Sequence, residues 1–285
     1  MNLRTARLLI ACPDARGIIA AVAKFVARHK GNILDADQHT DRDTGQFFMR
    51  VEIDLAGFKL TKTSFARSWT PVAKKYRMWW RVEWGDRPKR VAIFVSREGH
   101  CLSDILYRWR AGELPMDVRC VVSNHAELKR VARGYDVPYH HIPISEKTKA
   151  AQERKTIALL KRQKIDLIVL ARYMQILSGD FIAVYPERII NIHHSFLPAF
   201  AGPRPYHQAF ERGVKIIGAT SHYATEDLDQ GPIIAQQTMS VGHRDAIDDL
   251  VRKGRDLERV VLAAAVRAHL EDRILVWKNK TVVFE

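Results

Sequence analysis

The chain has 285 residues, of which 47% are apolar, and a formal net charge of +14. This length is enough for two globular domains. No uncharged apolar run reaches 18 residues, so we expect no membrane-spanning helix and no membrane partner. Its three cysteines (Cys12, Cys101 and Cys120) are widely spaced and match neither a disulfide framework nor a zinc motif. Such cysteine usage is typical of a reducing compartment, and we predict a cytoplasmic protein.

The positive charge is concentrated near the amino terminus. Residues 1–90 contain 18 Lys and Arg against 9 Asp and Glu, and most of the excess lies within residues 59–90. A basic patch can bind nucleic acid, but it can also be a solvated face or attract a small polyanion. Because no nucleic-acid-binding motif accompanies the charge, we predict that nucleic acid is not a partner.

Residues 1–84 have the pattern of a small domain. Apolar spacing predicts strands at 3–11, 32–39, 47–54 and 77–84, and helices near 15–29 and 60–74. Gly31 stands where a helix would end, and Thr44-Gly45 predicts a turn between two strands. The order βαββαβ indicates a ferredoxin-like sandwich.

The same stretch resembles an ACT regulatory domain. The similarity rests on residues 12–19 (CPDARGII), 31–33 (GNI), 37–41 (DQHTD) and 47–50 (FFMR). The resemblance implies an amino-acid effector bound after the first strand, and we assign Asp14, Gly17 and Asn32 to that site. Gly17 at a helix amino terminus would let a carboxylate approach free backbone N–H groups. The alternative is a domain that only joins copies of the chain, and we predict a homo-oligomer.

A linker at residues 85–90 precedes a different pattern at 91–285. Short apolar strands at 91–96, 118–123, 139–142, 165–171 and 189–192 alternate with helical segments, the longest at 146–163. Strands at 215–224 and 232–240, a helix at 245–270 and a final strand pair complete the domain. This alternation predicts a Rossmann-like, mostly parallel sheet.

Polar side chains follow the apolar pair Ile189-Ile190. Asn191 and His193 are two residues apart, so in a strand they point to the same face. Ligands of open parallel sheets bind at the carboxyl ends of the strands, where this pair should lie. His194 should point to the opposite face, which makes the two histidines a poor chelate. We therefore expect no metal site.

Three loops bear on the ligand. Residues 96–102 contain one glycine, too few for a loop whose backbone cradles a phosphate. Residues 172–177 offer an apolar wall with polar corners that suits a flat heteroaromatic ligand. Residues 225–231 bring several carboxylates, among them Asp229, before a Gly-Pro turn. His222 precedes that loop on a predicted strand and is placed to line the same pocket.

Taken together, Asn191-Ile192-His193 and the segment 229–234 (DQGPII) resemble the formyltransferase fold that uses 10-formyltetrahydrofolate. The resemblance covers about residues 90–285. It implies that Asn191, His193 and Asp229 form the catalytic group. It also implies that the folate-binding loop consists of Arg172, Tyr173, Met174, Gln175, Ile176 and Leu177.

Two features narrow the resemblance to the formyltetrahydrofolate deformylase family. Glycinamide ribonucleotide formyltransferases have a proline after the catalytic histidine, a phosphate loop and no ACT-like module, whereas this chain has His194 and the single-glycine loop. The resemblance implies hydrolysis of 10-formyltetrahydrofolate to tetrahydrofolate and formate, which balances one-carbon pools and supplies formate for purine synthesis. Folate is then the substrate, and no cofactor is expected.

Two other functions remain open at this level. A formyltransferase with an amine acceptor would use the same three catalytic residues. A folate or amino-acid sensor without turnover would use the same pocket, although an intact set of Asn191, His193 and Asp229 argues against it. Formate release with water as the only acceptor separates the three hypotheses.

Overall fold

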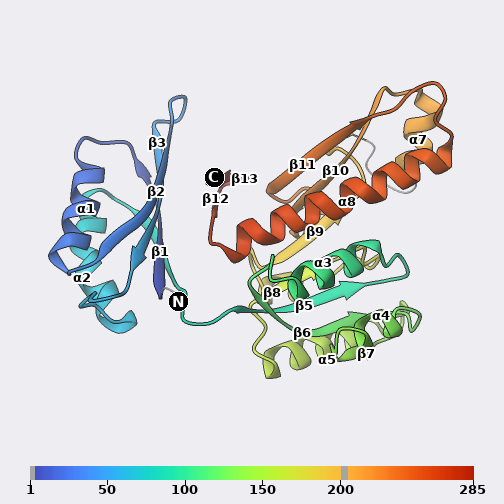
Figure 1. Ribbon diagram of the computed structural model, residues 1–285, viewed down its shortest axis with the longest axis horizontal. Helices are drawn as coiled ribbons and strands as arrows, with labels where there is room; N and C mark the ends of the chain where they lie inside the picture. Colours follow the sequence, from blue (N-terminus) through green and yellow to red (C-terminus); the bar gives the residue numbers. More distant parts are fainter. Residues whose placement is uncertain (1–3, 200–204) are drawn as a thin grey trace. The chain divides into compact units, whose positions relative to one another are not determined.

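The computed structural model describes residues 4–199 and 205–285, and the chain forms two compact units (Figure 1). Unit 1 consists of residues 1–88, 272–275 and 282–285, and unit 2 of residues 89–271 and 276–281. Strand β5 begins at Lys89, within the segment that we expected to be a linker. Residue 3, where we placed the start of the first strand, lies outside the described residues.

Unit 1 is a four-stranded antiparallel sheet with two helices on one face (Figure 1). Its elements are β1 (Thr5–Pro13), α1 (Ile18–Arg28), β2 (Asn32–Asp41), β3 (Gln46–Asp54), α2 (Lys62–Lys75) and β4 (Trp79–Trp84). The strand order is β2-β3-β1-β4. The predicted ferredoxin-like order βαββαβ is therefore confirmed.

The helices of unit 1 pack onto the sheet through aromatic side chains. Phe25 of α1 meets Phe65 and Trp69 of α2 edge-on, with ring centroids 5.6 Å and 4.8 Å away. Edge-to-face packing aligns the positive edge of one ring with the negative face of the other. Helix α2 begins at a capping box in which Thr61 and Ser64 bond each other's backbone N–H groups. The cap fixes the start of α2 and so the position of its aromatic face.

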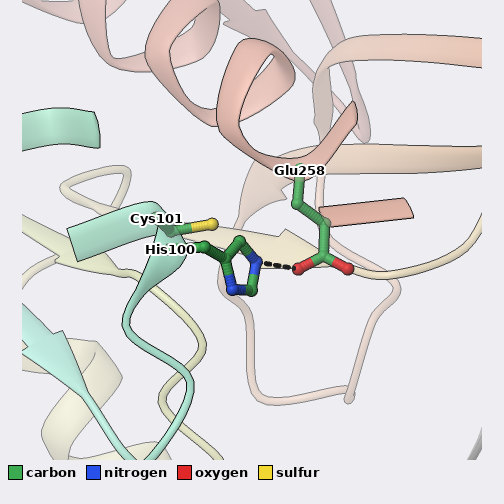
Figure 2. A group of neighbouring side chains, drawn as sticks. All are labelled: His100, Cys101 and Glu258. Carbon is green, nitrogen blue, oxygen red and sulfur yellow. Dashed lines mark hydrogen bonds and ion pairs between the residues drawn. The ribbon is translucent and has the colours of Figure 1, made fainter. Parts of the chain in front are cut away.

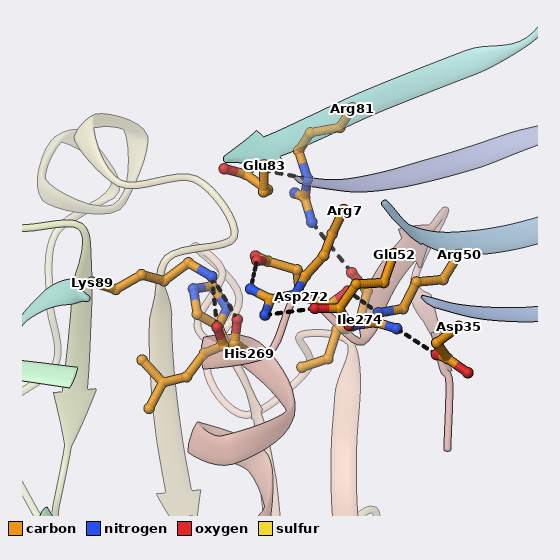
Figure 3. Close-up of polar contacts among 11 residues, drawn as sticks. Arg7, Asp35, Arg50, Glu52, Arg81, Glu83, Lys89, His269, Asp272 and Ile274 are labelled. Atoms are coloured by element: carbon orange, nitrogen blue, oxygen red, sulfur yellow. Dashed lines mark hydrogen bonds and ion pairs between the residues drawn. The ribbon is translucent and has the colours of Figure 1, made fainter. Parts of the chain in front are cut away.

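The second face of this sheet holds the end of the chain. Residues 272–275 and 282–285, which we expected in the second domain, belong to unit 1. Arg50 of β3 is 4% exposed and donates to the backbone oxygen of Asp272 at 3.1 Å (Figure 3). Phe284 is also buried, at 2% exposure. A hydrogen bond from a buried guanidinium and a buried ring therefore hold these terminal residues in unit 1.

Unit 2 is built on a seven-stranded sheet in the order β11-β10-β9-β8-β5-β6-β7. Strands β5 to β9 run parallel, and β10 and β11 are antiparallel to their neighbours. The strands are β5 (Lys89–Val95), β6 (Met116–Ser123), β7 (Tyr139–His141), β8 (Leu167–Leu170), β9 (Ile189–His193), β10 (Ile216–Tyr223) and β11 (Ile233–Ser240). A hairpin of β12 (Ile274–Trp277) and β13 (Lys280–Val283) closes the chain. The predicted fold class is confirmed.

Helices lie on the parallel sheet of unit 2 because its strands are apolar on both faces. They are α3 (His100–Arg110), α4 (Lys129–Arg133), α5 (Lys149–Arg162), α6 (Gly179–Val184), α7 (Pro205–Arg212) and α8 (Ile247–Leu270). Helix α8 packs along β9, β10 and β11 and against α3, whereas α5 and α6 share a core with the other face. Helix α4 has only five residues, and we did not predict it from the sequence. In the described part of the chain, no helix is long and apolar enough to cross a membrane.

Candidate active site

A cavity of about 680 Å³ opens at the carboxyl ends of β8 and β9 in unit 2. Asn191 and His193 lie on β9, and Arg172 follows β8 by two residues. All ten residues that we assigned to catalysis or substrate binding line this cavity: Asn191, His193, Asp229, Arg172, Tyr173, Met174, Gln175, Ile176, Leu177 and His222. The carboxyl edge of the sheet gathers them, as the general rule for such sheets predicts.

His193 and Asp229 form the central pair. Nδ1 of His193 lies 3.1 Å from Oδ2 of Asp229, and the histidine is only 5% exposed. Nε2 of His193 is buried and makes no hydrogen bond to any residue that the structure describes. One nitrogen of the ring is thus anchored by a carboxylate, and the other is available to a bound substrate.

Asp229 is held in its ionised form. Burial by itself raises the pKa of Asp229, but the hydrogen bond from Nδ1 of His193 and the neighbouring ring of His222 outweigh it, and the pKa lies well below the usual range. Its φ of 57° is in the left-handed region, which is uncommon for residues other than glycine. A Cβ on Gly231 would come within 1.8 Å of the backbone oxygen of Tyr223. The acidic loop can therefore approach β10 only because residue 231 is glycine.

His222 connects Asn191 to the acidic loop. Its Nδ1 lies 2.9 Å from the backbone oxygen of Tyr223, so this nitrogen carries the proton. Nε2 then accepts from Nδ2 of Asn191 at 3.2 Å, and Oδ1 of Asp229 is further away, at 3.6 Å. The amide of Asn191 keeps a second N–H, which can point at a substrate oxygen.

The segment 172–177 forms one wall of the cavity. Ser96 fixes it, because Ser96 N donates to the backbone oxygen of Arg172 at 3.1 Å and Oγ accepts from Met174 N at 2.9 Å. Met174 and Ile176 are each 58% exposed, which leaves apolar surface for a flat ligand. Tyr173 instead packs edge-on against Phe94 in the core. Hydrogen bonds of Ser96 thus fix the start of this wall, and its exposed side chains are apolar.

His194 lies beside His193 rather than away from it. The two ring centroids are 5.2 Å apart, and both residues line the cavity, so our prediction that they point to opposite faces is wrong. Strand β9 ends at His193, and its alternation of side chains does not extend to residue 194. Burial, with the nearby charge of Arg172, lowers the pKa of His194 to about 3. His194 is therefore neutral at neutral pH.

A second polar cluster lies at the other side of His194. Glu258 of α8 is 1% exposed, and its Oε2 lies 2.7 Å from Nε2 of His100 (Figure 2). Together with Cys101, these residues form a group of potential metal ligands. Burial and the charge of Glu258 raise the pKa of the Cys101 thiol well above its usual value, whereas zinc binds the thiolate. The guanidinium of Arg172, 3.4 Å from the same oxygen, already supplies the compensating cation. These residues suit a hydrogen-bonded cluster better than a metal.

The residues assigned to an amino-acid effector lie in unit 1. Asp14 and Gly17 are exposed in the loop between β1 and α1, and Gly17 has φ 89°. Asn32 pairs with Asp54, which also pairs with Thr5, so it lies at the opposite end of the sheet. Eight residues of strand separate the two ends, or about 26 Å. The chain brings Asp14 and Gly17 together but not Asn32, because α1 returns the backbone across the sheet.

Comparisons with known proteins agree with this architecture. Residues 89–266 match the formyl transferase family, and residues 6–64 match the ACT domain family. The chain is 54% identical over 284 residues to the formyltetrahydrofolate deformylase of Synechocystis sp., with complete coverage of both. The chain belongs to the formyltetrahydrofolate deformylase family. The membership predicted from the motifs is confirmed.

Two solved structures differ in how much of this chain they match. A crystal structure of a formyltetrahydrofolate deformylase from Pseudomonas syringae pv. tomato matches all of this chain and 96% of its own, with 49% identity and a TM-score of 0.95. A glycinamide ribonucleotide transformylase from Symbiobacterium toebii matches 71% of this chain and 97% of its own, with 31% identity and a TM-score of 0.67. The deformylase structure thus matches the whole chain, whereas the transformylase structure matches only 71% of it.

Sequence reasoning missed Glu258 and Tyr206, both of which line the cavity. Tyr206 donates to Oε1 of Glu258 at 2.7 Å. A signal for Glu258 exists, because it lies among the buried positions of α8, beside Leu257 and three residues before Val261. A charge on the apolar stripe of a helix needs a buried partner, and such partners gather at functional sites.

Proposed function

We propose that this deformylase-family enzyme hydrolyses 10-formyltetrahydrofolate to tetrahydrofolate and formate. The observation that carries the proposal is the grouping of Asn191, His193 and Asp229 in one cavity with the apolar wall 172–177. The wall suits the flat pteridine ring, and the three polar residues suit the reacting formyl group. Formate released in this way would balance one-carbon pools and supply purine synthesis.

The residues account for each bond that changes. Water adds to the formyl carbon, the carbonyl oxygen becomes an oxyanion, and the bond from carbon to N10 then breaks as N10 takes a proton. The free N–H of Asn191 can donate to the oxyanion, a contact worth on the order of 3 kcal/mol in the transition state. Nε2 of His193, which has no partner among the described residues, can take the proton of water and return it to N10.

Asp229 supports both steps. An ionised carboxylate at Nδ1 fixes the tautomer of His193 and stabilises the imidazolium that forms when Nε2 takes a proton. Because its pKa is lowered, Asp229 is a poor proton acceptor itself. We therefore assign the proton transfer to His193 and the orienting role to Asp229.

The test is formate release with water as the only acceptor. Purified protein should release one formate for each 10-formyltetrahydrofolate consumed, and Asn191→Ala should lower kcat about 100-fold or more. The absence of formate from the parent would refute hydrolysis. A formylated product that appears only when an amine is added would identify a transferase instead, and substrate binding without turnover would identify a sensor.

We further propose an amino-acid effector at the loop of Asp14 and Gly17. Backbone N–H groups at the start of α1 are available to a carboxylate, since no side chain caps that helix among the described residues. Glycine and methionine are the first candidates to add to the formate assay. We also propose a cytoplasmic homo-oligomer, which light scattering and fractionation can test.

A further inference from the structure

The last hairpin of the chain contacts the loop that carries Asp229. The turn between β12 and β13 lies within residues 276–281, which belong to unit 2. In this turn, Nδ2 of Asn279 donates to the backbone oxygen of Gln230 at 3.0 Å. Two residues later, the hydroxyl of Thr281 donates to the backbone oxygen of Ile233 at 2.5 Å. Two side chains of the hairpin thus bind two carbonyls of one short segment.

The segment that the hairpin binds is the backbone that leaves Asp229. Gln230 is the next residue in the chain. Gly231 passes so close to Tyr223 that a Cβ would come within 1.8 Å of its backbone oxygen, and Pro232 O accepts from Tyr223 N at 2.9 Å. Strand β10 and the hairpin therefore both fix the backbone directly after Asp229.

Asp229 depends on such support because it lies in an irregular loop. Its φ of 57° is in the left-handed region, which is unfavourable for a residue with a Cβ. Bonds inside the loop are local, from Thr225 Oγ1 to Asp227 O at 3.0 Å and from Gln230 N to the same oxygen at 3.3 Å. Its carboxylate must nevertheless stay within 3.1 Å of Nδ1 of His193. A catalytic side chain on a loop is placed only as precisely as the groups that support the loop.

The hairpin lies outside the region that matches the formyl transferase family. That match ends at residue 266, whereas β12 begins at Ile274. The deformylase structure from Pseudomonas syringae pv. tomato matches all of this chain. The contact with the Asp229 loop therefore involves a segment beyond the formyl transferase match.

We propose that Asn279 and Thr281 are positioning residues for the hydrolysis. They hold the backbone after Asp229, so that its carboxylate stays at Nδ1 of His193. Neither residue is among those that line the cavity, so both act through Asp229 and not on the substrate. This inference rests on the proposed function and names the residues that keep its catalytic carboxylate in place.

The first test separates kcat from KM in formate release. Thr281→Val keeps the shape of the side chain and removes its donor, and Asn279→Ala removes the other donor. Each variant should lower kcat about threefold to tenfold, the factor that one hydrogen bond contributes to an equilibrium. KM should stay within twofold, because the apolar wall 172–177 is a separate segment. The double variant should lose more than either single variant.

Conservative and surface variants serve as controls. Thr281→Ser keeps the hydroxyl and should stay within twofold of the parent in kcat. Lys280→Gln changes an exposed side chain between the two positioning residues and should leave kcat unchanged. If the double variant fails to fold, the two single variants carry the test.

A double-mutant cycle tests whether the effect passes through Asp229. In an Asp229→Asn background, Thr281→Val should lower kcat less than twofold further, because the carboxylate that it positions is already gone. The proposal is overturned if the two losses are fully additive, if folded Thr281→Val and Asn279→Ala both keep the kcat of the parent, or if Thr281→Ser loses as much as Thr281→Val.

Failure of the proposed function looks different, because the parent then releases no formate. Hydrogen exchange still tests the positioning role in that case. Backbone amides of residues 225–231 should exchange at least threefold faster in the double variant than in the parent, while those of β8 keep their rate. Equal exchange in the loop of parent and variant would also overturn the proposal.

Discussion

Two buried charges, one in each unit, are compensated in different ways. In unit 1, Arg50 uses every nitrogen of its guanidinium: Nη1 contacts Asp35 at 2.8 Å, Nη2 contacts Glu52 at 3.0 Å and Nε donates to the backbone oxygen of Asp272 (Figure 3). In unit 2, Arg172 compensates Glu258 but retains a buried Nη1 without a hydrogen bond to any described residue.

The difference indicates which cluster serves structure and which serves a ligand. A cation whose three nitrogens all donate a hydrogen bond holds chain segments together, as Arg50 holds the terminal residues of unit 1. A cation that lines a cavity with a donor unused retains the capacity to bind an anion. Substitutions in unit 1 should therefore change stability, and those around the cavity should change catalysis and ligand choice.

The largest effect should come from Asp229→Asn. The neutral amide cannot stabilise an imidazolium at His193, and it can favour the wrong tautomer, so kcat for formate release should fall about 1000-fold. The matched control is Asp227→Asn, an exposed aspartate of the same loop, which should stay within twofold of the parent. An equal loss in both variants would mean that the loop, rather than the carboxylate, was disturbed.

The next effect should be one of stability. Arg50→Met removes a buried cation and leaves Glu52 with one partner fewer, so the free energy of unfolding should fall by about 3 kcal/mol. Urea unfolding followed by tryptophan fluorescence measures it, since unit 1 contains Trp69, Trp79, Trp80 and Trp84.

The same variant has a surface control. Lys62→Met breaks an exposed pair with Asp86 and should cost less than about 1 kcal/mol. Neither variant should change kcat in the absence of an effector. A loss of kcat in Arg50→Met with stability unchanged would reverse the assignment of the two clusters.

The sequence was sufficient for features that depend on local pattern. Asn191 and His193 could be placed at a strand end because an apolar pair precedes them and strands alternate with period two. The position of Asp229 near them followed from resemblance, because no local rule brings residues 36 apart in sequence together. The structure supplies the reason, which is the close approach of Gly231 to Tyr223.

The sequence was insufficient where a residue is defined by a distant partner. Glu258 and Arg172 are 86 residues apart, and only the packing of α8 across the sheet brings them together. Asp272 was expected in the second domain, just before its final strand pair, yet Arg7 and Arg50 hold it in unit 1. Such pairings depend on tertiary structure, and neither periodicity nor composition contains them.

The smallest expected effect is a dependence of stability on pH, which should differ between the Arg50 cluster and the Glu258 cluster. A guanidinium stays charged at any accessible pH, whereas a carboxylate such as that of Glu258 can be protonated. The pKa of Glu258 is lowered in the folded protein. A lowered pKa contributes stability above the unfolded pKa of about 4.3, and this contribution disappears as the pH falls through the folded pKa. The stability gap between the parent and Glu258→Gln should therefore shrink between pH 5.5 and 3.5, by at most about 1.4 kcal/mol per pH unit.

Urea unfolding followed by circular dichroism measures this stability gap. The gap between the parent and Asp256→Asn, a substitution on the exposed surface of the same helix, should be nearly constant over this pH range. A gap that widens on acidification would mean that Glu258 is protonated in the folded protein, and a neutral carboxyl could not form the ion pair with Arg172.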